Sequence, residues 1–360
     1  MTRPPRTAPR APSEPKTAPA DAAAPARGRK RMQMADIARL AGVSASTVSR
    51  ALSGSPLIPE ATRVRIAELA KSLNYRVNIA AANLRKQEVQ TVGVVILGET
   101  MQAISDPFLL SILGTVADTL DEHGMSLLLT RLKDGQGYRL SEMVESGQVR
   151  GLIVIGQLTW HDQLNMLAAR GIPMAVWGAC LPDALYPMVG GDNEQGGYLA
   201  TQHLIQQGCQ KIAFFGDTDH PEAGARHQGY LKAMREAGIE EDARLQQPFL
   251  FGDKRIRSVI DEWLNRQLAF DAIFAASDVT AISIMAALKE RGILVPDQVK
   301  VVGYDDIALA QHVHPSLSSI SQPTLSAGKA LVGLLLDAIA GHPKRTIVLP
   351  AKLVVRESSR

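Results

Sequence analysis

The sequence predicts a small all-α N-terminal domain followed by a larger α/β domain of two doubly wound lobes. Between residues 34 and 75, apolar side chains recur at helical spacing in three short segments. Beyond Gln90, short apolar strand candidates alternate with helical stretches, which is the pattern of a parallel sheet covered by helices. Single hydrophobic cores stop growing at about 250–300 residues, so this second region is expected to form two lobes.

The N-terminal end of the chain is basic. Residues 1–31 consist largely of Pro, Ala, Arg and Lys, and they are expected to form a disordered tail because they offer almost nothing to bury. Residues 1–90 hold 16 Lys and Arg against 6 Asp and Glu, an excess of +10, whereas the whole chain carries +3. This end is suited to contact phosphates, because neutralising them releases condensed counterions.

The three helical segments between residues 32 and 78 have the layout of a helix-turn-helix domain. Gly42 breaks the first segment at the tight corner that this motif tolerates. Ser44 lies where an N-cap hydroxyl accepts a backbone N–H from a second helix at 45–52. The third helix is expected to begin at Pro59, since Pro is favoured at the first helical position.

The second helix carries the residue types that a recognition helix uses in the DNA major groove. Such a helix presents small polar side chains near its N-terminus and a long donor further along. The candidates are Ser44, Thr47 and Ser49 for phosphates and Ala45, Ser46 and Arg50 for base edges. Arg50 can bind a guanine through two hydrogen bonds, which discriminates against a wrong base by ~1–3 kcal/mol. An ordinary Ser/Thr-rich amphipathic helix is the structural alternative.

Several motifs resemble the LacI/GalR family of bacterial repressors. They include Asp36-Ile37-Ala38, Ala41-Gly42-Val43-Ser44, Thr47-Val48-Ser49-Arg50 and, near the C-terminus, Val301-Val302-Gly303-Tyr304-Asp305-Asp306. The resemblance covers nearly the whole chain after residue 32. It implies an N-terminal all-α helix-turn-helix domain followed by an α/β periplasmic-binding-protein-like domain of two doubly wound lobes.

The expected domain boundaries follow from these segments. They are a tail at 1–31, a helix-turn-helix domain at 32–78, a hinge helix and linker at 79–90, and an effector-binding domain at 91–360. Lobe 1 is expected at about 91–180 and 322–345, and lobe 2 at about 181–321 and 346–360. The last strand is expected at Leu349–Val354.

The family's hinge pattern falls on Asn78, Ala81 and Leu84. The resemblance implies that paired hinge helices of a dimer fold on the operator and insert leucines into the minor groove. Leu84 is the expected wedge, because apolar wedges that unstack a base step kink DNA by ~20–90°. Without the preceding domain, a single Leu in a linker would be explained as a packing residue. Ser53 is a further candidate for DNA contact.

The resemblance also implies a small-molecule effector in the cleft between the lobes. The residues carried over are Asp106 and Phe108 from lobe 1 and Arg226, Phe251, Ser277 and Asp305 from lobe 2, and Trp160 is a further stacking candidate. These types suit a polyol, because carboxylates accept from hydroxyls, guanidinium donates, and an aromatic face covers a sugar ring. A sugar or sugar derivative is therefore expected, with a nucleobase or other non-sugar metabolite as the alternative.

Three of these residues also have structural explanations. Asp106 before Pro107 can cap the next helix, Asp305 can close a turn at a strand end, and Trp160 can belong to the core. Ser277-Asp278 stands where many relatives carry Asn-Asp, which leaves the identity of the effector open.

Two other classes of function fit the sequence less well. An enzyme is not expected, because the sequence has no P-loop, no G-x-S-x-G elbow and no H-E-x-x-H motif. With only Cys180 and Cys209 and no C-x-x-C, neither a metal site nor a cofactor is expected. A secreted solute-binding receptor would match residues 91–360. Such a receptor needs a signal peptide, whose continuous apolar stretch is not expected in the Ala-, Pro- and Arg-rich start, and it would not carry a basic helical domain.

The sequence thus predicts a cytoplasmic bacterial regulator, located at the nucleoid when bound to DNA. Its expected partners are a double-stranded palindromic operator, a small-molecule effector and a second copy of itself, with no membrane span. The expected role is repression of sugar-utilisation genes under allosteric control by the effector.

Overall fold

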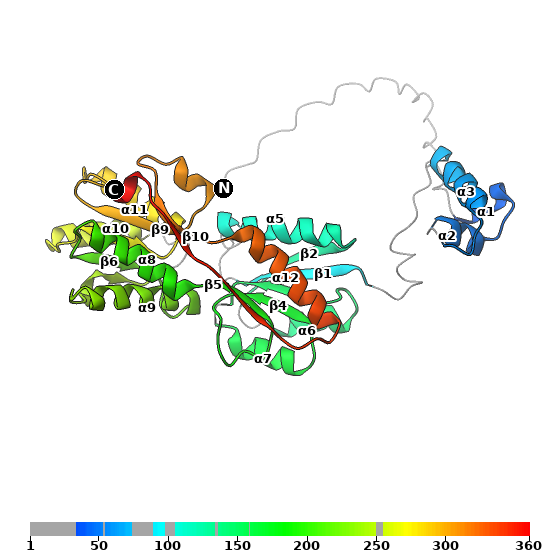
Figure 1. The fold of residues 1–360 in the computed structure, drawn as a ribbon, viewed down its shortest axis with the longest axis horizontal. Coiled ribbons are helices and arrows are strands. Elements are labelled where there is room, and N and C mark those ends of the chain that lie inside the picture. Colours follow the sequence, from blue (N-terminus) through cyan, green and yellow to red (C-terminus); the bar gives the residue numbers. More distant parts are fainter. Residues whose placement is uncertain are drawn as a thin grey trace, which may run out of the picture. The chain divides into compact units, whose positions relative to one another are not determined.

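A computed structural model of the chain describes residues 34–52, 55–73, 89–97, 105–133, 136–157, 159–249 and 255–360. The predictions for the tail at 1–31 and for Ser53, Asn78, Ala81, Leu84 and Phe251 lie outside these residues. The chain forms two compact units, Met1–Arg85 and Lys86–Arg360 (Figure 1).

Within its described residues, 34–52 and 55–73, the first unit contains three helices, α1 at Met34–Ala41, α2 at Ala45–Leu52 and α3 at Glu60–Ser72. They enclose a small core whose buried members are Ile37, Ala38, Val48, Ala51 and Ile66. Gly42 has a φ of +67°, which lets the chain turn between α1 and α2 without a steric clash. The predicted start of the third helix is wrong by one residue. Pro59 keeps an extended backbone as the N-cap, and α3 begins at Glu60.

The described residues of the second unit form two six-stranded sheets. The first has the order β11-β5-β4-β3-β1-β2, with β1 at Thr91–Leu97, β2 at Ser126–Leu132, β3 at Leu152–Ile155, β4 at Met174–Trp177, β5 at Met188–Gly191 and β11 at Thr346–Leu349. Its helices are α5 at Pro107–Glu122, α6 at Tyr138–Glu145, α7 at His161–Ala169 and α12 at Thr324–Ile339. Figure 1 shows α12 beside α5 over this sheet.

The second sheet has the order β12-β10-β9-β8-β6-β7. The strands are β6 at Ile212–Phe215, β7 at Gln246–Gln247, β8 at Ala272–Ala275, β9 at Lys300–Asp305, β10 at Ser318–Ser321 and β12 at Lys352–Val354. The helices are α8 at Asn193–Gln206, α9 at Pro221–Glu236, α10 at Ile256–Asn265 and α11 at Asp278–Glu290, with 3-10 turns η2 at Ala243–Leu245, η3 at Ala308–Gln311 and η4 at Glu357–Ser359. All strand pairs are parallel except β10 with β12.

The chain passes between the two sheets after β5, after β10 and between β11 and β12. These crossings correct the predicted lobe limits, because β5 and β11 belong to the first sheet although residues 181–321 and 346–360 were expected in lobe 2. The predicted strand Leu349–Val354 is two short strands in different sheets, separated by Pro350 and Ala351. Pro350 has no backbone N–H to extend β11, so the strand ends there.

Candidate functional site

The N-terminus of α2 is built around the hydroxyl of Ser44. Its Oγ accepts from the backbone N–H of Thr47 at 3.1 Å and lies 2.8 Å from Ser46 Oγ and 2.9 Å from Thr47 Oγ1. Ser44 therefore caps the helix, as predicted.

One face of α2 is turned away from the domain core. Val48 and Ala51 are buried, whereas Ala45, Ser46 and Arg50 are exposed and Ser49 is half-buried. Side chains four residues apart share a helix face, so Ala45 lies beside Ser49 and Ser46 beside Arg50. The sequence-predicted base-contacting side chains thus point outward, with Ala45 and Ser46 at the positive, N-terminal end of the helix dipole and Arg50 in the last turn of α2.

In the second unit, Asp106 performs the capping role that the sequence allowed. Its Oδ1 accepts from the backbone N–H groups of Phe108 at 2.8 Å and Leu109 at 3.3 Å at the start of α5. Burial raises the pKa of Asp106, and these two N–H groups and the positive charge of Arg226 oppose that rise. Phe108 is buried, with its ring centroid 5.7 Å from that of Trp177 at the end of β4.

Arg226 on α9 is held by contacts from three other elements. Its Nε donates to Asn193 Oδ1 at 2.8 Å, and its Nη1 donates to the carbonyl of Ala276 after β8. The guanidinium carbon lies 3.7 Å from the centroid of the Tyr304 ring in β9, a cation–π contact. The α8 and α9 backbones meet closely here, because a Cβ on Gly197 would lie 1.9 Å from the Arg226 carbonyl oxygen.

Asp305 ends β9 in a conformation that L-residues rarely adopt, with φ at 107°. Its Oδ1 accepts from Gln322 Nε2 at 2.8 Å. Burial raises the pKa of this carboxyl well above its ordinary value, the positive charge of Arg226 opposes the rise, and the negative charges of Asp106 and Asp278 add to it. A non-glycine residue at such a φ costs about 1–3 kcal/mol and is concentrated at functional sites.

The side chains of Ser277 and Asp278 form hydrogen bonds to the start of α11 and to the segments that follow β9. Ser277 Oγ accepts from the backbone N–H of Thr280 at 3.3 Å and so caps α11. Asp278 is fully buried and accepts from Ser319 Oγ at 2.6 Å and from the backbone N–H of Ile307 at 2.8 Å. Asp278 therefore holds the turn that follows Asp305.

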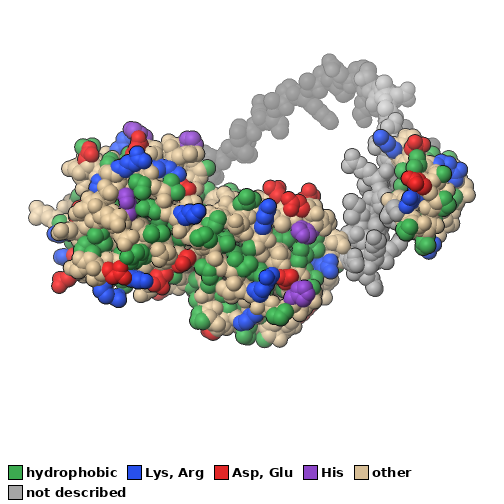
Figure 2. All heavy atoms as spheres, in the orientation of Figure 1, with side chains coloured by type: hydrophobic (Ala, Val, Ile, Leu, Met, Phe, Trp, Pro, Cys, Tyr) green, Lys and Arg blue, Asp and Glu red, His purple; other side chains and the backbone are tan. Residues whose placement is uncertain are grey.

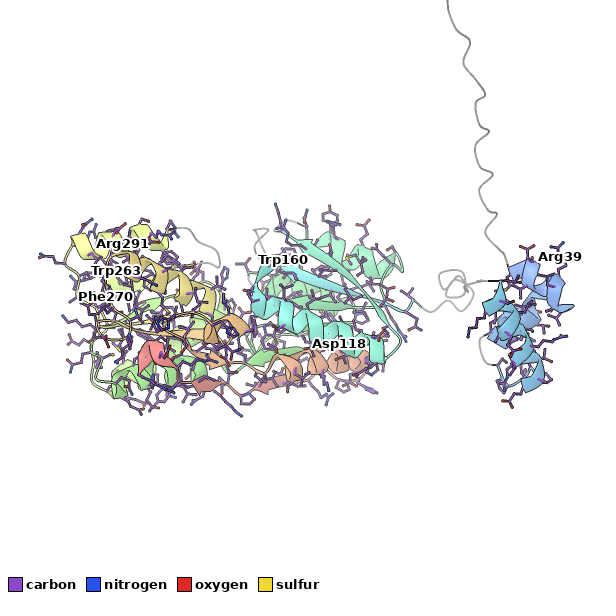
Figure 3. The ribbon with its side chains drawn as sticks, turned by 90° about the horizontal axis from the view of Figure 1, so that it is seen from above. Arg39, Asp118, Trp160, Trp263, Phe270 and Arg291 are labelled. Carbon is purple, nitrogen blue, oxygen red and sulfur yellow. The ribbon has the colours of Figure 1, made fainter. Side chains whose placement is uncertain are left out.

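The expectation that Trp160 contacts a ligand is not supported by its position. Its side chain, labelled in Figure 3, is 2% exposed, and it belongs to a core cluster that includes Leu140, Leu164 and Val176. A Trp ring buried among aliphatic side chains contributes packing rather than a stacking surface.

The structure therefore brings together part of the predicted site. Asp106 at the N-cap of α5, Arg226 from α9 and Asp305 from β9 are close enough that the Arg226 charge opposes the rise that burial causes in the pKa of both carboxyls. Two buried amides that the sequence did not reveal complete the arrangement, Asn193 beside Arg226 and Gln322 beside Asp305. An Asn at a helix start suggests only a cap, so nothing in the sequence distinguished these amides.

The described residues contain no group of three or more His, Cys, Asp or Glu side chains placed to hold a metal ion. No helix in the described part of the chain is long and apolar enough to cross a membrane. On the face of the second unit shown in Figure 2, acidic and basic side chains are interspersed.

Comparisons with known proteins agree with this arrangement. The model of bacterial regulatory proteins of the lacI family matches residues 33–78, and that of a periplasmic binding protein-like domain matches residues 201–359. The HTH-type transcriptional regulator CelR of Thermobifida fusca is 35% identical over 92% of this chain and 99% of its own length. The HTH-type transcriptional repressor PurR of Photobacterium profundum is 30% identical over 90% of this chain and 97% of its own length. A solved complex of the transcriptional regulator CelR with cellobiose is 33% identical in sequence and has a TM-score of 0.69. The match covers 91% of this chain and 100% of the chain in that structure.

Proposed function

The chain belongs to the LacI family of bacterial regulatory proteins, and on this basis we propose that it is a repressor that binds operator DNA through α2 and a small-molecule effector through its two-lobed unit. One observation carries the proposal. A single chain joins a helix with an outward polar and basic face to a separate unit that gathers two carboxyls and a guanidinium from different elements.

The proposed DNA contacts are those of the recognition helix and the hinge. Ser44, Thr47 and Ser49 contact phosphates, and Ala45, Ser46 and Arg50 face base edges, with Ser53, Asn78, Ala81 and Leu84 as further contacts. We propose a homodimer, because two copies related by a two-fold axis match the two halves of a palindromic operator. The place of action is then the cytoplasm, at the nucleoid.

The proposed effector is a sugar or sugar derivative. Two carboxyls can accept from sugar hydroxyls while Arg226 donates, and that mixture suits a ligand rich in hydroxyls. The CelR relative was solved with cellobiose, which supports the same class. Phe108, Phe251 and Ser277 remain proposed contacts. The regulators among the relatives give no support to catalysis or to a receptor without DNA function.

The proposal is tested with the full chain in two assays. In gel retardation, a palindromic duplex from upstream of the chain's own gene should be retarded more strongly than a shuffled duplex of equal composition. In thermal unfolding, cellobiose should raise the midpoint, because a ligand that binds only the folded state stabilises it by about 2.7 kcal/mol at 100 times its Kd. Stabilisation by hypoxanthine alone would favour the nucleobase alternative, and equal retardation of both duplexes would contradict the DNA-binding role.

A further inference from the structure

Two buried amides connect the charged side chains of the candidate site to the segment where the chain first crosses between sheets. Asn193 and Gln322 are each 5% exposed. Asn193 begins α8, directly after the crossing that follows β5, and Gln322 lies in the crossing that follows β10.

Asn193 bridges Arg226 and the crossing with its two amide atoms. Its Oδ1 accepts from Arg226 Nε at 2.8 Å, and its Nδ2 donates to the carbonyl of Gly191 at 3.1 Å. A displacement of the guanidinium by a ligand would therefore pull directly on the backbone of Gly191.

Gln322 makes the corresponding link from Asp305. Its Nε2 donates to Asp305 Oδ1 at 2.8 Å, and its Oε1 has no hydrogen-bond partner in the described part of the chain. That Oε1 faces Gly191 so closely that a Cβ added to the glycine would lie 2.4 Å from it. The two links thus meet at one residue.

Gly191 is also tied to the third crossing. The backbone N–H of the next residue, Asp192, donates to the carbonyl of Leu349 at 2.9 Å, where β11 ends. Gly191 therefore lies where the three segments joining the two sheets come into contact.

We propose that Gly191, with Asn193 and Gln322, forms the junction through which a ligand at Arg226 and Asp305 changes the geometry of the crossings. In this role Asn193 and Gln322 are positioning residues that transmit the ligand's presence without contacting it. The inference rests on the proposed function of Arg226 and Asp305 as effector contacts.

The variant Asn193→Asp tests the link to the Gly191 carbonyl while it keeps the hydrogen bond that orients Arg226. The carboxylate keeps an acceptor for Arg226 Nε but loses the donor to the Gly191 carbonyl. Gly191→Ala disturbs the same junction at Gln322, because the new Cβ must displace Gln322 Oε1. The matched controls are Asn265→Asp on the exposed end of α10 and Gly333→Ala on α12, where an added Cβ meets nothing within 4 Å.

The full-length variants are compared by cellobiose titration calorimetry and by operator affinity with and without saturating cellobiose. An allosteric coupling typically changes affinity about 5–150-fold, and in Asn193→Asp we expect this ratio to fall below about 2-fold. The Kd for cellobiose should stay within about threefold, a difference under about 1 kcal/mol. An unchanged ratio in both junction variants, or loss of cellobiose binding in Asn193→Asp, would overturn the proposal.

A chain without substitutions that fails to bind cellobiose would count against the proposed sugar effector, and not against the junction. In that case, the operator affinity measured without ligand tests the junction. Asn193→Asp and Gly191→Ala should each change it at least about threefold relative to their controls, because the junction sets the arrangement of the crossings. Equal affinities for variants and controls would overturn the junction.

Discussion

At the scale of single residues, Arg226 controls the charge balance of the candidate site. Its guanidinium opposes the burial-driven rise in the pKa of both Asp106 and Asp305. Two of its nitrogens are already bonded to Asn193 and to the Ala276 carbonyl, so its orientation is fixed before any ligand arrives. Such preorganisation reduces the ordering cost of binding.

Arg226→Ala is expected to abolish the response to cellobiose while specific binding to the operator is retained. The substitution removes a donor of the candidate site on α9 of the second unit, whereas the helix proposed to contact DNA, α2, belongs to the first unit. Fluorescence anisotropy with a labelled operator measures both quantities. Arg235→Ala, at an exposed position of the same helix, is the control. A normal sugar response in Arg226→Ala would remove Arg226 from the site.

Arg50→Ala is expected to reduce the preference for the operator over shuffled DNA by ~1–3 kcal/mol, because a two-bond contact to guanine is lost. Competition binding at constant salt measures the preference. Arg39→Ala on α1, with a 78% exposed side chain that pairs with Asp36, removes the same charge from the same unit. Equal losses in the two variants would show that only charge matters.

At the scale of elements, α2 depends on its N-cap. Ser44→Ala is expected to destabilise the first unit by ~1 kcal/mol, because the backbone N–H of Thr47 loses its acceptor. Chemical denaturation of residues 1–85 measures this, with Ser46→Ala as the control because no backbone cap bond involves Ser46 Oγ. Equal stability of the two variants would contradict the capping role.

The contact between the start of α11 and the turn after β9 depends on the buried carboxyl of Asp278. Burial raises the pKa of Asp278 to about 7 from its ordinary 3.8. A carboxyl whose pKa is higher in the folded state than in the unfolded state contributes stability that is present below about pH 4 and is lost as the pH rises to about 7.

Asp278→Asn should therefore lose less stability than the chain without substitutions when the pH rises from about 5 to about 7. The urea midpoint at each pH measures this, with Asp118→Asn at an exposed position of α5 as the control. Because the negative charge of Asp278 also adds to the raised pKa of Asp305, its removal reduces the Asp305 contribution as well, and both effects flatten the pH profile of Asp278→Asn. Parallel pH profiles would contradict the assignment.

The sequence predicted the elements whose apolar pattern is strong and missed those whose pattern is weak. The described helices of the first unit were expected at nearly their observed positions, and β1, with six buried residues, has the continuous apolar run that predicts a buried strand. β5 reads Met-Val-Gly-Gly and β10 reads Ser-Ser-Ile-Ser, and neither has the apolar run that marks a strand. Asn193 and Gln322 could not be identified because their role depends on contacts between segments far apart in the chain.

At the scale of the whole molecule, the division into two units has a direct consequence. The second unit has its own cores and contains every described residue of the candidate effector site. Residues 86–360 are therefore expected to fold alone and to bind cellobiose with the Kd of the full chain, which calorimetry can compare. A much weaker Kd in the fragment would indicate that the first unit contributes to the site.

Transcriptional control requires both units to act in one chain. The most direct test is an anisotropy titration of the full chain with a labelled operator duplex and a shuffled duplex, each with and without cellobiose. We expect the operator to be bound more tightly than the shuffled duplex, and cellobiose to change that affinity about 5–150-fold. The same affinity for both duplexes, unaltered by the sugar, would contradict the account.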